Sequence, residues 1–187
     1  MTSLRAPLTR RLLLALGPAL LMGGGARAQV QLAPPELAQA LSGASLAGQS
    51  RFRVWGFEVY DASLWVRQGF SATGFDAHPL ALELRYLRDF AALDIAERSL
   101  KEMRRLTTVS AEQEKRWLDE MRRVFPNVKK GDRLLGVQQP GQGAAFWFNG
   151  QLRGDIRDAE FARLFFGIWL SPRSSEPALR QALLGTP

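Results

Sequence analysis

Residues 51–66 read RFRVWGFEVYDASLWV, a run rich in aromatic and β-branched side chains. Such residues favour strands, and Gly56 interrupts the run, so we expect one long bent strand or two consecutive strands here. Alternation sorts the side chains onto two faces, with Phe52, Val54 and Tyr60 on one and Arg51, Arg53, Trp55, Phe57 and Val59 on the other. This segment sets the architecture, because a strand pair rich in aromatic residues needs further sheet and a covering layer to bury it.

A second expected strand follows the turn-rich residues 69–79. Its apolar face carries Leu80, Leu82, Leu84 and Tyr86, while Glu83 and Arg85 point the other way. Arg88 falls in phase with the apolar face, where a guanidinium needs a carboxylate, a ligand anion or water at the sheet edge. Arg88 is therefore a candidate anion-binding residue; the alternative is that it leaves the sheet or pairs with Glu58 or Asp89.

Two amphipathic helices come next. The first has apolar residues at helical spacing behind a capping-box pattern of Asp94 and Glu97. The second opens with the capping pair Ser110 and Gln113 and ends before Pro126. Opposite charges four residues apart, as in Arg98 with Glu102, are typical of solvated helix faces.

The last third of the chain returns to strands, which we expect over residues 133–138, 144–148 and 151–155. Asn149-Gly150 is a strong hairpin signal between the last two. Asp158 is placed to cap an apolar helix that Pro172 terminates, and a short helix over residues 177–184 closes the chain. Residues 29–49 read as a short helical or irregular lead-in, so the pattern predicts one α+β domain over residues 29–187.

Residues 1–28 have the pattern of a secretory leader, with four arginines, no acid, an apolar core over residues 12–22 and Ala26-Arg27-Ala28 at the end. We expect cleavage after Ala28 and a periplasmic or secreted protein with no stable membrane anchor. Arg10-Arg11 makes the twin-arginine route possible. The whole chain has 187 residues and a net charge of +7, and loss of the leader with its four arginines leaves 21 basic and 18 acidic side chains. The apparent basic excess thus largely disappears, and we expect no nucleic-acid partner.

Several classes of chemistry are excluded by composition. The chain has no cysteine and one histidine, His78, so disulfides, thiolate metal sites and multi-histidine metal sites are absent. It also has no phosphate-binding glycine loop and no nucleophile elbow. We therefore expect no cofactor and no metal.

Six strings of the sequence together resemble the chalcone isomerase family, in particular its bacterial exported chalcone isomerase-like branch. They are GFEVYDASLW at residues 56–65, LRY at 84–86, SLKEM at 99–103, FPNVKKGD at 125–132, FNG at 148–150 and FFGIWL at 165–170. The resemblance implies an open-faced β-sandwich, an antiparallel sheet with helices packed on one face and a pocket between them.

The family includes isomerases that close a chalcone to a flavanone without a cofactor, and noncatalytic fatty-acid-binding proteins. The enzymes use an arginine on an early strand and a threonine that orients a water. In this chain Ala47 takes the place of that arginine and Trp55 that of the threonine. The resemblance therefore assigns no catalytic residue here.

Three hypotheses about function remain. The first is a noncatalytic protein whose cleft binds a small apolar or fatty-acid-like carboxylate, with candidate ligand-binding residues Arg88, Arg53, Tyr60, Tyr86 and Trp55, and Arg51 as a further anchor. The second is a cofactor-free isomerase acting on an unknown enone, with Tyr60 or Tyr86 as the acid. The third is an envelope protein whose exposed FFGIWL helix docks a protein partner.

Overall fold

The computed structural model describes residues 33–185. The expected leader, residues 1–28, and its cleavage site lie outside the described residues. Within the described part, no helix combines the length and apolar character needed to cross a membrane.

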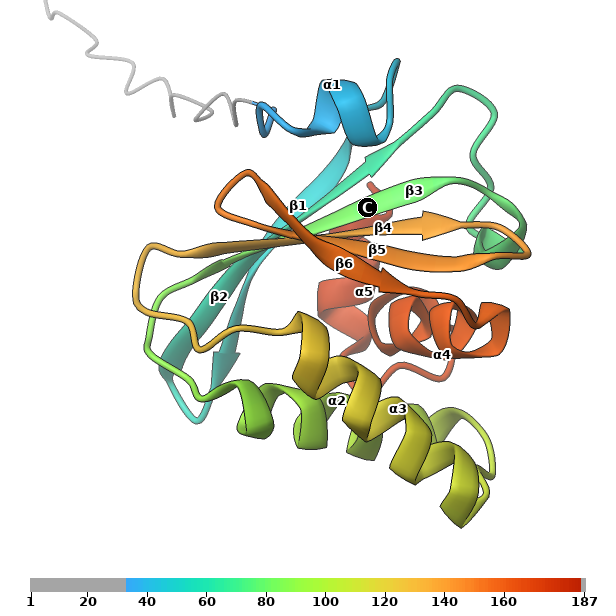
Figure 1. Cartoon of the computed structure of the whole chain (residues 1–187). Coiled ribbons are helices and arrows are strands. Elements are labelled where there is room, and N and C mark those ends of the chain that lie inside the picture. The colour runs from blue at the N-terminus through green and yellow to red at the C-terminus, as the bar shows by residue number, and fades with distance from the viewer. Residues whose placement is uncertain (1–32, 186–187) are drawn as a thin grey trace, which may run out of the picture. The chain divides into compact units, whose positions relative to one another are not determined.

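A six-stranded antiparallel sheet forms the centre of the fold, and its strands lie side by side in chain order (Figure 1). The strands are β1 (Ser45–Val54), β2 (Phe57–Val66), β3 (Leu80–Tyr86), β4 (Arg133–Gln139), β5 (Gly143–Phe148) and β6 (Gln151–Ile156). Each strand pairs with the next, so every connection returns the chain antiparallel to its neighbour. This arrangement confirms the expected antiparallel sheet.

Residues 51–66 belong to a hairpin, with Trp55-Gly56 as its two-residue turn. β1 begins at Ser45, so the expected lead-in is wrong for residues 45–49. The prediction for Phe57 is also wrong, because Phe57 pairs with Val54 across the turn and shares its face. The alternation of side chains between the two faces does not continue through a turn. A register shift between Phe52 and Arg53 changes it a second time.

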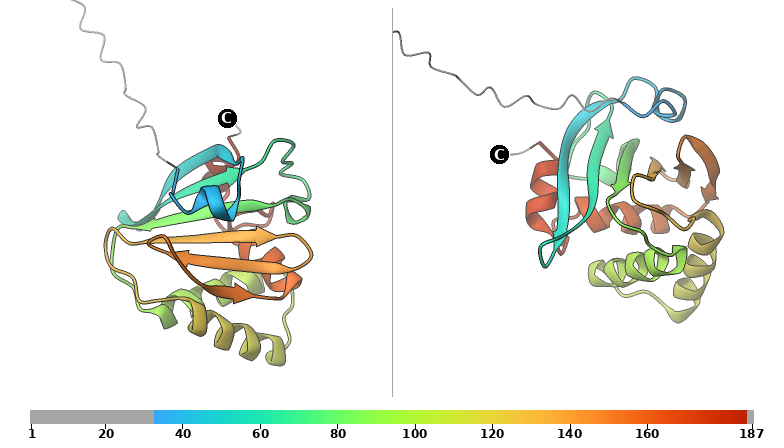
Figure 2. Two further views of the ribbon diagram at one scale, coloured as in Figure 1. Left: turned by 45° about the horizontal axis from the view of Figure 1, so that its top comes forward. Right: turned by 90° about the vertical axis from the view of Figure 1, so that its left-hand side faces the viewer.

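The helices lie mainly on one side of the sheet. α2 (Ala92–Leu106), α3 (Ala111–Val124), α4 (Ala159–Leu170) and α5 (Pro177–Leu183) cover one face, as the two further views show (Figure 2). The short α1 (Leu37–Ala40) packs on the other face against Trp65 and Leu135, and a 3-10 turn, η1 (Phe75–Ala77), precedes β3. The α+β class with helices packed on one face of the sheet is thus confirmed.

Two of the three expected helix caps are confirmed. Ser110 and Gln113 form the capping box of α3, and the Asp158 carboxylate accepts a hydrogen bond from the Phe161 amide at the start of α4. The cap predicted for the preceding helix is wrong, since α2 begins at Ala92. Its Ala92 amide donates to Asn127 Oδ1 at 2.9 Å, a side chain 35 residues away that local pattern could not indicate.

α4 lies in the main core. Phe165, Phe166, Trp169 and Leu170 are all buried there, and Gly167 packs closely against Leu106, whose Cδ1 would lie 2.9 Å from a Cβ at that position. The hypothesis that an exposed FFGIWL helix docks a partner is therefore wrong. The apolar character of this helix is explained by packing between the sheet and α2.

Candidate functional site

A pocket of about 560 Å³ lies between the helix-covered face of the sheet and helices α2, α4 and α5. Its walls are mostly apolar or aromatic: Phe52, Val54, Trp55, Phe57, Val59, Tyr60, Leu84, Tyr86, Phe90, Ile95, Leu134, Phe165, Ile168, Trp169 and Leu179. The volume and lining are those of a small-molecule site. We call it the sheet–helix pocket.

Packed aromatic rings form one wall of this pocket. Tyr60 stacks on Phe52 with ring centroids 5.0 Å apart, and Tyr86 meets the edge of Tyr60 at 6.2 Å. Trp169 Nε1 of α4 donates a hydrogen bond to the Tyr60 hydroxyl at 3.1 Å. Because that hydroxyl accepts from Trp169, its own proton is available to a group in the pocket.

Both tyrosines remain neutral at physiological pH. Burial raises the pKa of Tyr60, and this effect outweighs the hydrogen bond from Trp169. Burial also raises the pKa of Tyr86, with a smaller contribution from Tyr60. The two phenols are therefore hydrogen-bond donors rather than bases.

A buried carboxylate, Glu102 of α2, lies at the polar part of the lining. Its oxygens contact Arg98 at 2.9 Å and Arg105 at 3.3 Å, and accept a hydrogen bond from Ser175 Oγ at 2.9 Å. Only 6% of Glu102 is exposed, so its assignment to a solvated helix face is wrong. Helical spacing from Ile95 and Ser99 to Glu102 was the signal that could have placed it in the pocket wall.

Arg88 is the pocket's cation without a carboxylate partner. Its guanidinium carbon lies 5.1 Å from the centre of the Phe57 ring, within cation–π range. No acid within residues 33–185 pairs with it, and the two acids considered as partners are used elsewhere. Glu58 binds Arg51 and Arg53, and Asp89 accepts from the Lys130 amide.

The other arginines of the first hairpin lie apart from the pocket lining. Arg51 contacts Asp61 at 2.6 Å and Glu58 at 2.8 Å, and Arg53 contacts Glu58 at 3.0 Å. Asp61 and Glu58 raise the pKa of Arg51, and the two arginines lower the pKa of Glu58. Of the five predicted ligand-binding residues, the structure therefore brings Arg88, Tyr60, Tyr86 and Trp55 together at the pocket and leaves Arg53 in a separate ion-pair cluster.

The two positions at which the resembling enzymes carry their catalytic pair have separate surroundings. Ala47 of β1 packs against the main core and is not among the pocket-lining residues. Trp55 lies in the hairpin turn and is 94% exposed. An alanine and an exposed indole supply neither a cation nor a hydroxyl to a reacting group.

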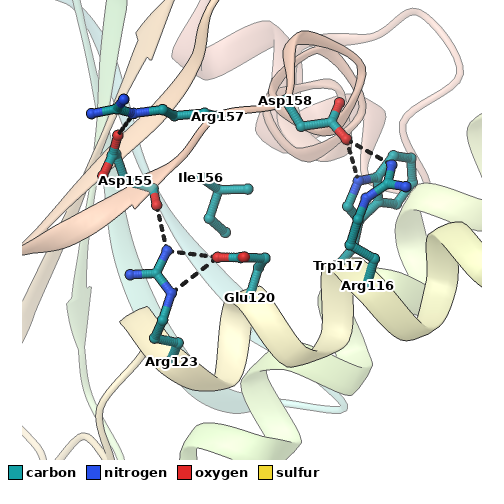
Figure 3. A pocket seen from close by; sticks show the side chains of 8 residues that line it. All are labelled: Arg116, Trp117, Glu120, Arg123, Asp155, Ile156, Arg157 and Asp158. Atoms are coloured by element: carbon teal, nitrogen blue, oxygen red, sulfur yellow. Dashed lines mark hydrogen bonds and ion pairs between the residues drawn. The ribbon is translucent and has the colours of Figure 1, made fainter.

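A second, polar pocket of about 340 Å³ lies between α3 and the connection from β6 to α4 (Figure 3). Its three arginines all have acidic partners: Arg116 with Asp158, Arg123 with Glu120 and Arg157 with Asp155. Asp158 also accepts from Trp117 Nε1 at 2.8 Å. These contacts tie α3 to the start of α4 and leave no unpaired charge to hold a ligand.

Metal ligands are not gathered anywhere in residues 33–185, where no three histidine, aspartate or glutamate side chains are grouped closely enough to hold an ion. The pocket's polar groups are instead two phenols, two indoles, two serines, the arginines Arg88 and Arg98 and the carboxylates of Asp94, Glu102 and Glu176. Such groups bind an organic ligand by hydrogen bonding and charge.

Comparison with known proteins agrees with the fold. A fatty-acid binding protein from Arabidopsis thaliana has a crystal structure that superimposes with a TM-score of 0.61 over 77% of this chain and 88% of that chain, at 11% identity. At this identity the likeness shows a shared fold.

Sequence comparison gives the family. An uncharacterized protein of Haemophilus influenzae is 33% identical over 135 residues, which span 70% of this chain and 63% of that protein. The chain thus matches less than two thirds of that relative's length. The model of the chalcone isomerase-like family matches residues 30–185, most of the chain, and the protein therefore belongs to the chalcone isomerase-like family.

Proposed function

We propose that the protein binds a small apolar molecule with a carboxylate, of the fatty-acid type, in the sheet–helix pocket and releases it unchanged. The observation that carries this proposal is the combination of a pocket walled by aromatic and aliphatic side chains with one unpaired cation, Arg88. An apolar chain gains from leaving water in such a pocket, and a guanidinium without an internal partner favours a carboxylate.

The position of Arg88 suggests how the ligand lies. Arg88 is exposed and next to Phe57 at the hairpin end of the pocket, whereas Tyr60 and Trp169 are deeper in the core. A carboxylate held by Arg88 stays near water while the chain extends along the aromatic wall. The Arabidopsis protein of the same fold is itself a fatty-acid binding protein, which supports this class of ligand.

The isomerase hypothesis has less support from the same pocket. An acid catalyst must release its proton, but burial raises the pKa of both Tyr60 and Tyr86. Arg98, the other arginine in the lining, is paired with Glu102 at 2.9 Å and so carries less free charge for an oxyanion. Hydrogen bonding to a bound ligand is the simpler role for these groups.

We further propose that the protein works outside the cytoplasm, as the leader-like residues 1–28 indicate. From the pattern of residues 26–28 we expect the new N-terminus at Gln29. Intact-mass measurement of the protein isolated from the periplasm of a bacterial host tests this part. A chain starting at Gln29 supports it, and a full-length cytoplasmic chain contradicts it.

The ligand proposal is tested by mass spectrometry of molecules that co-purify with the protein. The informative variant is Ser99→Phe, which adds a ring to the pocket wall on α2, where Ser99 is buried and bonds only to the Ile95 carbonyl. Leu152→Phe on β6 is the matched control, because Leu152 is 62% exposed and away from this pocket. Long-chain carboxylates released by the wild type and by Leu152→Phe, but not by folded Ser99→Phe, support the proposal. Equal amounts from all three would contradict it.

A further inference from the structure

The tip of the first hairpin exposes two aromatic side chains at the mouth of the sheet–helix pocket. Trp55 is 94% exposed and Phe57 is 61% exposed. Among the large apolar side chains of the described residues, only Leu152 has a comparable exposure, at 62%. Leu93, in the first turn of α2, is 43% exposed, and its neighbours Asp94 and Ile95 line the same pocket.

The backbone at this tip is in a conformation that tryptophan does not favour. Trp55 has φ 48° and Gly56 has φ 82°, as in a two-residue type I′ turn, where asparagine is the preferred first residue. The other such turn in the sheet, Asn149-Gly150, has φ 49° and 87° and follows that preference. A bulky residue with positive φ is a true outlier, and this one has almost no contact to compensate for the strain.

Three cations without a carboxylate partner in the described part of the chain lie at the same end of the sheet as the tip. Arg88 lies on the Phe57 ring, and the exposed Lys129 and Lys130 are joined to this end of the sheet through the Gly131 amide, which donates to the Tyr86 carbonyl. None of these three cations has a carboxylate partner within residues 33–185. The neighbouring acids Asp89 and Asp132 accept instead from the backbone amides of Lys130 and Lys129.

We infer that the hairpin tip with Trp55 and Phe57, together with Leu93, Arg88, Lys129 and Lys130 at the same end of the sheet, docks the protein onto an anionic lipid surface with the pocket mouth toward the lipid. Tryptophan and phenylalanine enter the headgroup region favourably, and lysine and arginine are attracted to anionic lipids. The charge complementarity selects a lipid surface over an apolar protein groove. This surface shares Arg88 with the proposed ligand site, whereas Lys129 and Lys130 are not among the pocket-lining residues.

The test is binding of the isolated protein to phosphatidylcholine vesicles with and without phosphatidylglycerol, followed by sedimentation and by tryptophan emission. All five tryptophans of the sequence lie within residues 33–185. Trp65, Trp117 and Trp169 are buried and Trp147 is partly buried, whereas Trp55 is exposed. A blue shift of the emission therefore reports entry of Trp55 into lipid. We expect binding and a blue shift with phosphatidylglycerol present, and weakening of both as salt is added.

Three variants separate this inference from its alternatives. Trp55→Asn keeps the turn and should weaken vesicle binding about tenfold or more. Lys129→Gln with Lys130→Gln should weaken it about fivefold per lysine, only with phosphatidylglycerol present. Leu152→Asn, the control on β6, should change nothing.

The inference would be overturned by any of three results: unchanged vesicle binding in Trp55→Asn, an equal loss of binding in Leu152→Asn, or no detectable binding to vesicles of either composition. Self-association that needs Trp55 and occurs without vesicles would also overturn it, since the tip would then be a protein interface.

Discussion

Trp55 and Asn149 occupy the same position in two hairpin turns of the same sheet. Their φ angles are 48° and 49°, and each is followed by a glycine with φ above 80°. Asparagine is preferred at this position, whereas a large side chain is strained there. Trp55 thus reduces the stability of the first hairpin, and the second hairpin shows what the unstrained turn contains.

Replacing Trp55 with Asn should raise the free energy of unfolding by about 1 kcal/mol, because strain is removed and an indole that is 94% exposed contributes little packing. Asn149→Trp should lower it by a similar amount, with the added loss of the hydrogen bond from the Arg133 amide to Asn149 Oδ1. Urea unfolding followed by circular dichroism measures both changes. A loss of stability in Trp55→Asn would contradict this explanation of the turn.

Asp158 should make stability depend on pH. Its partial burial alone would raise its pKa, but hydrogen bonds from the Phe161 amide, Trp117 and Arg116 outweigh burial, so the net pKa is lowered. A lowered folded-state pKa means that the stabilisation is present above the unfolded value of about 3.9 and is lost as the pH falls through the folded value.

Asp158→Ala should therefore cost about 2 kcal/mol at neutral pH, because a cap is lost and Trp117 Nε1 is left unpaired, and much less at low pH. The control is Asp119→Ala, whose carboxylate is 55% exposed beside Lys115 and should contribute less than about 0.5 kcal/mol. Urea unfolding across the acid range distinguishes the two. Equal pH profiles for both variants would show that Asp158 has no special role.

Glu83 should have the opposite pH dependence. It is 1% exposed on the sheet face opposite α2, and neither carboxylate oxygen has a hydrogen-bond partner within residues 33–185. Burial raises its pKa despite Arg133 and Arg85 nearby. Stability is then highest below the unfolded pKa of about 4.3 and is lost as the pH rises through the folded value.

Glu83→Gln should accordingly stabilise the protein by about 1 kcal/mol at neutral pH and have little effect in acid. Glu58→Gln should have the opposite sign at neutral pH, because Arg51 and Arg53 lower the pKa of Glu58. Thermal unfolding at several pH values measures both. A destabilised Glu83→Gln protein at neutral pH would mean that ionised Glu83 has a favourable partner.

Local pattern was sufficient for much of this fold. The Asn149-Gly150 turn, the Ser110–Gln113 box and the Asp158 cap each depend on residues within four positions of one another, and all three are confirmed. The alternation from Leu80 to Tyr86 also holds. What depends on contacts distant in sequence was predicted poorly, as the cap of α2 by Asn127 shows.

The site divides in the same way. The alternation of side chains along β3 correctly predicts that Arg88 lies at the pocket. Alternation alone does not predict that Arg53 forms an ion pair with Glu58 across the hairpin. Glu102 is misassigned because Arg98 lies four residues before it on α2, while another of its partners, Ser175, is 73 residues away. Trp169 reaches Tyr60 across 109 residues, a contact that only the tertiary fold creates.

The most direct test of ligand binding in the sheet–helix pocket is calorimetric titration of delipidated protein with palmitic acid and with its methyl ester. Arg88→Ala and Arg53→Ala form the matched pair, since both remove an exposed arginine near the first hairpin but only Arg88 lines the pocket. We expect saturable binding of one acid per chain, weaker binding of the ester, and about a tenfold loss of acid affinity in Arg88→Ala with none in Arg53→Ala. Absence of saturable binding to the acid, or equal losses in the two variants, would contradict the account.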